Sequence, residues 1–162
     1  MNHAVDTLIE SEQGVAISDA PAPTRAQILN LQESIIEARR AMGLSTTLGD
    51  MKECPLTHHF APGLYAREIF LPAGTVVVGK IHRHAHINTI SKGRVFVATE
   101  FGFVELVAPV TFVSQPGTKR ALVAQEDTIW TTYHPTEETE LSKIEEHVIA
   151  PSYRALEKEL LS

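Results

Sequence analysis

The sequence has few of the features that define several large classes of protein. Its single cysteine, Cys54, cannot form a disulfide within the chain, which is typical of proteins from a reducing compartment. No apolar run approaches the roughly 20 residues that cross a bilayer as a helix. The first residues also lack the basic and then apolar stretches of a secretory signal. These absences predict a cytoplasmic protein without a membrane partner.

Positive charge is scarce as well. The chain has 14 Lys and Arg residues against 20 Asp and Glu residues, a formal net charge of -6 with neutral histidines. Binding to nucleic acid depends on a basic face that releases counterions from phosphates. We therefore expect no nucleic-acid partner. The acidic residues are densest over Glu137–Glu146, which we interpret as the solvated face of a helix.

The length of the chain limits its organisation. With 162 residues, 43% of them hydrophobic, it can form one packed domain but not two of ordinary size. We divide this one domain into an arm over residues 1–22, an N-terminal helix over residues 23–43, a β-barrel over residues 44–136 and a helical tail over residues 137–162.

The predicted N-terminal helix is amphipathic. Thr24 and Gln27 match a capping box, and apolar residues recur at helical spacing from Ile28 to Met42, just before Gly43. The apolar stripe predicts that the helix packs either on the barrel or on a second copy of the chain. We therefore expect a homo-oligomer.

Short β segments follow a loop expected over residues 44–62. They are rich in β-branched and aromatic residues, and turn residues separate them at intervals of roughly 8–12 residues, as in an all-β barrel or sandwich. Helices are expected again over Glu137–Glu146 and Ser152–Leu161. The predicted strands are Gly63–Leu71, Thr75–Ile81, His86–Ile90, Arg94–Thr99, Phe103–Val107, Val110–Ser114, Lys119–Ala124 and Thr128–Tyr133.

Residues 80–88, KIHRHAHIN, are the most informative segment of the chain. Successive side chains of a strand point to opposite faces, so His82, His84, His86 and Asn88 are expected to share one face. Neutral imidazole is the commonest metal ligand in proteins. The alternating histidines favour a metal or polar-ligand site over a row of water-bonded histidines at a barrel mouth.

The surrounding stretch PAGTVVVGKIHRHAHINTISKG, residues 72–93, resembles the first motif of the cupin superfamily. In that motif a glycine precedes H-x-H, a Glu or Gln follows, and a second glycine closes the turn. His82 and His84 match the H-x-H pair. The third position falls on Asn88 or, counting back from the closing glycine, on His86. The resemblance implies an all-β, cupin-type antiparallel β-barrel or jelly roll with an N-terminal amphipathic helix and C-terminal helices.

The second cupin motif, P-x-G followed by a histidine, matches less well. Residues 115–117 supply the turn, but Arg120 stands at the histidine position, and a guanidinium has no lone pair for a metal. His134, at the end of the last strand, is the substitute that we weigh against an exposed histidine. An inward Arg120 would instead favour an anion. We therefore predict metal ligands at His82, His84, His86 and His134, and ligand-binding residues at Arg120, Asn88, Trp130 and Tyr133. Trp130 and Tyr133 are included because of their place in the late strands, where Trp130 could equally be a core residue.

The resemblance leaves several functions open, because cupins include enzymes, binding proteins and storage proteins. The first is a metal-dependent protein that binds or transforms a small polar or anionic molecule, with zinc, iron, nickel, manganese or copper as the metal. The second is a metal-free, non-catalytic scaffold or interaction protein. The third is a sensor or inhibitor that holds a small anion through Arg120 and the histidines. The chain is also similar to cupin-like proteins of tailed phages, which would make it a phage accessory or structural component in the host cytoplasm.

Overall fold

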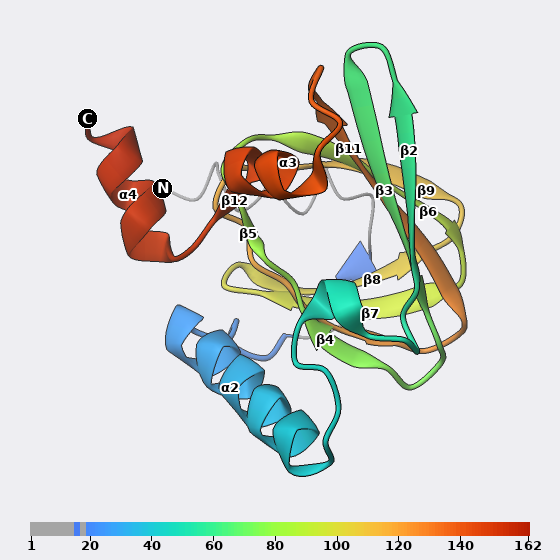
Figure 1. The fold of residues 1–162 in the computed structure, drawn as a ribbon. Coiled ribbons are helices and arrows are strands. Elements are labelled where there is room, and N and C mark those ends of the chain that lie inside the picture. The colour runs from blue at the N-terminus through green and yellow to red at the C-terminus, as the bar shows by residue number, and fades with distance from the viewer. Residues whose placement is uncertain (1–14, 17–18) are drawn as a thin grey trace.

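The fold is a sandwich of two five-stranded antiparallel sheets (Figure 1). It was obtained as a computed structural model that describes residues 15–16 and 19–162, so most of the predicted arm lies outside the described residues. The first sheet has the order β1 (Val15–Ala16), β8 (Gly102–Val107), β7 (Arg94–Thr99), β10 (Ala121–Ala124) and β4 (Val76–Val78). The second has the order β2 (Leu56–Ala61), β3 (Leu64–Leu71), β11 (Thr128–Pro135), β6 (His86–Lys92) and β9 (Val110–Ser114).

The predicted all-β jelly roll with flanking helices is confirmed. Within the described part of the chain, however, no sheet closes into a barrel. A third, two-stranded pair joins β12 (Ile149–Ala150) to β5 (Ile81–His82) at one end of the sandwich. This pair attaches the C-terminal part of the chain to the strand that carries His82.

Two of the expected strand boundaries were wrong. The expected strand over residues 75–81 is divided into β4 and β5, which belong to different sheets. The expected loop over residues 44–62 contains the short 3-10 helix η1 (Leu48–Asp50) and the whole of β2. Strand β2 lies at a sheet edge and has only two partly buried residues, Leu56 and His58, so the alternation that marks a strand is faint in its sequence.

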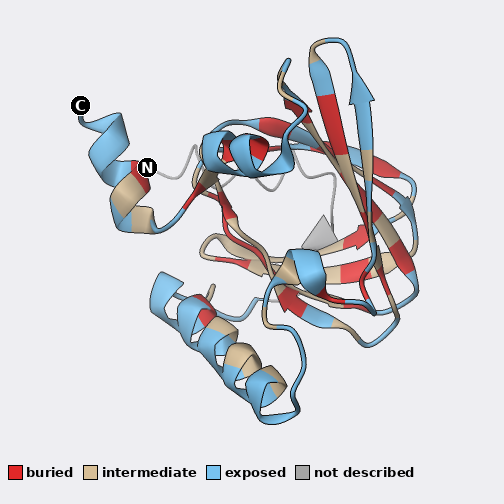
Figure 2. Ribbon diagram, in the orientation of Figure 1, coloured by how far each residue is buried: buried red, intermediate tan, exposed pale blue. Residues whose placement is uncertain are grey.

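Helix α2 (Arg25–Ala41) lies outside the sandwich, beside β4 (Figure 1). Its predicted capping box is confirmed, because the Thr24 hydroxyl accepts a hydrogen bond from Gln27 N at 3.2 Å and Gln27 Oε1 accepts one from Thr24 N at 2.8 Å. Ile28 is the buried residue of this helix, and most of its remaining surface is exposed or partly exposed (Figure 2). Ile35 and Ile36 are partly buried, so the apolar stripe is covered only in part.

Two further helices follow the sheets, α3 (Leu141–Val148) and α4 (Tyr153–Leu160). Helix α3 lies across one end of the space between the sheets (Figure 1), and its Ile144 and Val148 pack on Tyr65 of β3. Ser152 caps α4 by accepting a hydrogen bond from Ala155 N. No helix in the described ranges is long and apolar enough to span a membrane.

The residues that face inward change from apolar to polar along the strands of the second sheet. Strand pairing places Ile69 of β3 and Ile90 of β6 on either side of Trp130 of β11, within the main apolar core. Two residues along, Arg67 and Asn88 flank Thr132. Two residues further, Tyr65 is paired with His134. The sandwich interior thus has an apolar end and a polar end, and α3 covers the polar one.

Gly93 forms the turn between β6 and β7 and is the glycine that closes the first motif. Its φ of +93° is unfavourable for residues with a side chain. A Cβ there would lie 2.5 Å from Asp127 O and 2.4 Å from Thr128 Oγ1. The turn therefore requires glycine, both for its conformation and for the close approach of the next loop.

Candidate functional site

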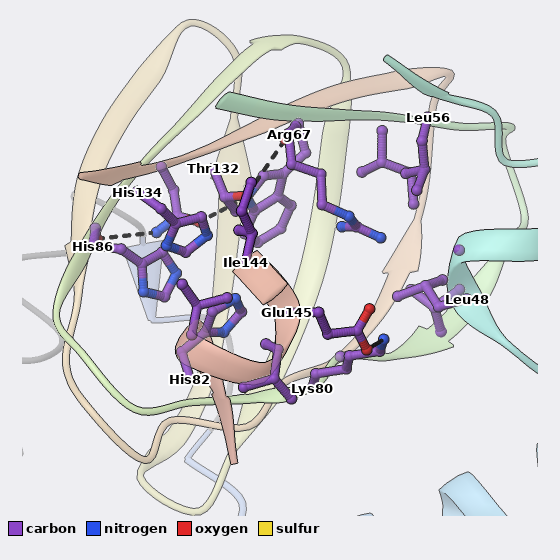
Figure 3. Close-up of a pocket in the computed structure, with 18 of the residues that line it drawn as sticks. Leu48, Leu56, Arg67, Lys80, His82, His86, Thr132, His134, Ile144 and Glu145 are labelled. Atoms are coloured by element: carbon purple, nitrogen blue, oxygen red, sulfur yellow. Dashed lines mark hydrogen bonds and ion pairs between the residues drawn. The ribbon is translucent and has the colours of Figure 1, made fainter. Parts of the chain in front are cut away.

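A cavity of about 300 Å³ occupies the polar end of the sandwich (Figure 3). Strands β3, β5, β6 and β11 contribute polar side chains, and α3 supplies Ile144, Glu145 and Val148. Leu48 and Leu56 add apolar surface on the side away from the histidines. The cavity is therefore a mixed site, with a polar wall on the sheet and an apolar rim.

Three of the four predicted histidine ligands meet in this cavity. The ring centroids of His82 and His86 are 4.1 Å apart, those of His86 and His134 5.1 Å, and those of His82 and His134 5.3 Å. His86 and His134 are almost fully buried, with 5% and 4% of their surface exposed. Residues separated by up to 52 positions in the sequence thus form one cluster of rings (Figure 3).

The buried rings favour the neutral state. Loss of solvation lowers the pKa of His82 to about 2, with His86, His134, Arg120 and Arg67 adding to the effect. Desolvation also lowers the pKa of His86 to about 4 and that of His134 to about 4. All three rings are consequently uncharged at neutral pH, and each has one nitrogen lone pair, as a metal ligand requires.

The structure does not bring His84 to the cavity. Residues 83–85 form a bend between β5 and β6, so the alternation expected over residues 80–88 is broken there. Arg83 N donates to Val148 O at 2.8 Å, and Arg83 Nε donates to Ile149 O at 3.0 Å. The His84 side chain is exposed, with its ring centroid 5.2 Å from that of His147 on α3. Because of this bend, the His84 ring lies outside the cavity, and the third ring of the cluster is that of His134.

The spacing of the three rings fits a common metal ion. With metal–nitrogen bonds of about 2.1 Å, the centroids of imidazoles bound to one ion lie about 5 Å apart, close to the separations in the cluster. Among the described residues, however, no group of three or more His, Cys, Asp or Glu side chains is arranged so that it could hold a metal ion. The ring spacing alone is therefore compatible with a metal, and the arrangement as it stands is not a formed metal site.

Two arginines line the same cavity. Arg120 is 7% exposed, and its guanidinium carbon lies 5.6 Å from the centre of the Phe112 ring. Its charge contributes to the lowered pKa of His82 and His86. Arg67 of β3 was missed by the sequence analysis. It could have been found, because alternation along the expected strand over residues 63–71 places Arg67 on the same face as Ile69 and Leu71.

The other predicted ligand-binding residues differ in position. Asn88 and Trp130 line the cavity, but their side-chain polar atoms form hydrogen bonds with other residues of the protein. Trp130 Nε1 donates to Asn88 Oδ1 at 2.9 Å, and Asn88 Nδ2 donates to Ser114 Oγ at 2.7 Å. Tyr133 does not line the cavity, because its neighbours Thr132 and His134 do and successive side chains of β11 alternate.

A tyrosine–histidine pair also faces the cavity. His58 Nδ1 and Tyr65 Oη are 2.8 Å apart, and the Tyr65 ring stacks on His134 at a centroid distance of 6.2 Å. Desolvation lowers the pKa of His58 and raises that of Tyr65, so both are neutral at pH 7. The pair was not predicted from the sequence, because His58 was expected to lie in a loop.

Comparisons with known proteins support the fold. No family model and no curated protein matches the sequence. Among solved structures, the chain is similar to a salicylate 1,2-dioxygenase from Pseudaminobacter salicylatoxidans, with a TM-score of 0.50, 12% identity and coverage of 81% of this chain and 40% of that one. KdgF from Halomonas sp. is 21% identical over 54% of this chain and 83% of its own, with a TM-score of 0.46. An RmlC-like cupin from Shewanella frigidimarina NCIMB 400 is 21% identical over 53% and 79%, with a TM-score of 0.44.

These similarities concern the fold alone, since the identities are low and the chain spans about 40% of the length of the dioxygenase. The chain has the cupin fold.

Proposed function

We propose that the cavity binds a divalent transition metal on His82, His86 and His134 and brings a small polar or anionic molecule to it. The observation that supports this proposal is the cluster of three neutral imidazoles, two of them buried and that of His82 partly buried, with centroids 4.1–5.3 Å apart. Packing three imidazoles in a core offers little apolar burial, so binding a ligand gives a physical reason for the arrangement.

A metal bound to imidazoles supplies a Lewis acid that polarises a ligand oxygen or activates a bound water molecule or dioxygen. The residues of the chain would act around it. Arg120 offers positive charge to an anionic group, and the Tyr65–His58 pair can hold or move a proton at the tyrosine oxygen. Helix α3 restricts the access of water to the cavity.

The size of the cavity supports a small molecule as the ligand. A volume of about 300 Å³ is at the lower end of the range for small-molecule sites. The structurally similar salicylate 1,2-dioxygenase also acts on a small molecule, according to its name. A macromolecular ligand would not enter a cavity that α3 covers.

Metal analysis of protein purified without a histidine tag tests this function. We expect about one metal ion per chain after reconstitution with zinc, iron, manganese, nickel or copper. The metal should be lost in the His86→Ala and His134→Ala variants. His84→Ala is the matched control, because His84 belongs to the same motif but is exposed, and this variant should keep its metal. Failure of all five metals to bind, or equal metal content in all variants, would contradict the proposal.

A second candidate is a metal-free protein that binds a small anion. The position of Arg120 in the cavity wall favours it, because a buried guanidinium repels a metal cation and attracts an anion. Stabilisation by small anions that is lost in Arg120→Ala, in protein that binds no metal, would favour this candidate over the first.

A further inference from the structure

Arg67 has an unusual environment for a charged residue. It lies in the inner row of β3, and its guanidinium points into the cavity on the side away from His86 (Figure 3). Within the described ranges, no hydrogen bond or ion pair reaches this guanidinium, and desolvation lowers its pKa. A partly buried charge without a hydrogen-bonded counterion is costly, so an anion that binds beside it would be favoured.

The carboxylate of Glu145 lies on the same side of the cavity (Figure 3). Glu145 belongs to α3 and pairs with Lys80 Nζ, while its negative charge also acts on Arg67 and raises the pKa of that residue. No ion pair joins Glu145 to Arg67 in the described part of the chain. Glu145 therefore compensates Arg67 electrostatically but leaves its hydrogen-bond donors unused.

The neighbouring surface restricts the kind of anion. Leu48 and Leu56 line the cavity on the same side as the Arg67 guanidinium, so the body of the ligand would be apolar (Figure 3). Three cationic and two acidic side chains line the whole cavity, the acids being Asp50 and Glu145. This balance favours a single negative charge over a phosphate dianion. A planar guanidinium matches a carboxylate with two parallel hydrogen bonds.

We propose that Arg67 anchors a subsite for a small monocarboxylate with an apolar body, and that Glu145 competes with this ligand for the positive end of the cavity. The inference rests on the proposed function because it concerns the same cavity, and it adds the class of the ligand and an internal competitor. The ligand carboxylate takes the guanidinium donors of Arg67. Its charge is repelled by Glu145, so Glu145 weakens binding.

Calorimetric titration with benzoate, and with benzamide as its neutral analogue, tests the subsite in chelator-treated protein. We expect benzoate to bind and benzamide not to bind. Arg67→Met should weaken benzoate binding at least about tenfold, since a hydrogen-bonded charge pair is lost. Arg67→Lys should give an intermediate loss. Glu145→Gln should bind benzoate about three- to tenfold more tightly.

Glu146→Gln is the matched control, because Glu146 is an exposed neighbour on the same helix and does not line the cavity. It should bind benzoate as the unchanged protein does. Equal binding by Arg67→Lys and the unchanged protein, or no gain in Glu145→Gln, would overturn the proposal. If Arg67→Met does not fold, benzoate binding by Arg67→Lys and Glu145→Gln still tests the proposal.

Metal content, measured on the same preparations, separates this proposal from the proposed function. Protein that binds metal but shows no benzoate binding, in either the unchanged chain or Glu145→Gln, would overturn the carboxylate subsite alone. Benzoate binding that depends on Arg67, in protein that binds no metal under any condition, would support the subsite and contradict the metal-dependent function.

Discussion

The two ends of the sandwich interior are built from the same strands but have opposite chemistry. At one end, Ile90, Leu71 and Leu106 are at most 1% exposed and pack in one apolar cluster. At the other end, the next inward positions of these sheets carry His86, His134 and further polar side chains. The first end stabilises the fold by burial of apolar surface. The second buries polar side chains instead, which lowers the free energy of unfolding unless those groups find partners.

The largest expected difference between the two ends is in how the free energy of unfolding responds to acid. In metal-free protein, the lowered pKa of His86 and His134, about 4 each, means that the unfolded chain takes up protons below pH 6.5 while the folded chain does not. Above pH 6.5 the rings are neutral in both states, so they do not lower the free energy of unfolding. Below pH 6.5 the free energy of unfolding decreases progressively until the pH reaches about 4, where the folded rings are protonated as well. We expect a loss of about 2 kcal/mol per buried ring at pH 5.

Denaturant unfolding of chelator-treated protein at pH 7 and pH 5 measures this loss. The His134→Gln variant should lose less stability between the two pH values, because one shifted group has been removed. His84→Gln, which changes an exposed ring, should behave as the unchanged chain does. Identical pH dependence in all three proteins would show that the rings are not desolvated as described.

Truncation in the apolar end should have the next largest effect. Ile90 is 0% exposed, so Ile90→Ala leaves a cavity in the core and should reduce the free energy of unfolding by about 3 kcal/mol. Ile87→Ala is the matched control on the same strand, because Ile87 is 49% exposed. Its expected cost is below about 1 kcal/mol. Urea unfolding at pH 7 measures both, and equal costs would remove the distinction between the inner and outer faces of β6.

The boundary between the two ends depends on Asn88. Removing its amide in Asn88→Ala leaves Trp130 Nε1 and the Ser114 hydroxyl without their partners, and should cost about 2 kcal/mol. Thr89→Ala, on the outer face of the same strand, loses only an exposed hydroxyl contact with Thr111 and should cost below about 0.5 kcal/mol. A small effect of Asn88→Ala in urea unfolding would mean that water replaces the amide in the wall.

The smallest expected effect has the opposite sign. In ligand-free protein, Arg67→Met removes a desolvated charge and should raise the free energy of unfolding by about 1 kcal/mol. Arg94→Met is the control, because Arg94 is more exposed and pairs with Glu105 at 3.1 Å. That variant should lose up to about 1 kcal/mol. A destabilised Arg67→Met protein in thermal unfolding would show that Arg67 supports the fold.

Local patterns in the sequence were sufficient for much of the fold. Turn residues at regular intervals predicted most of the strands, and the Thr24–Gln27 pair predicted the start of α2. Strand alternation selected His82 and His86, and the histidine missing from the second cupin motif led to His134; the structure brings these three rings together. These features could be predicted because each depends on neighbours in the sequence or on strand alternation.

What could not be predicted depends on contacts between distant segments. His84 is turned outward because Arg83 is bonded to Val148 and Ile149, more than 60 positions away. The covering of the cavity by α3 likewise follows from packing of Ile144 and Val148 on Tyr65. No local periodicity contains this information, so a single sequence gives the strand but not the bend that interrupts it.

The pairing of β12 with β5 affects the order in which the molecule is assembled during synthesis. Residues 141–150 follow every strand of the two large sheets along the chain, so those sheets can form before α3 and β12 leave the ribosome. In the described part of the chain, β5 pairs with β12 alone, so the strand that carries His82 gains its sheet partner only after the two large sheets have been synthesised. His86 and His134, on β6 and β11, can therefore be placed earlier in synthesis than His82.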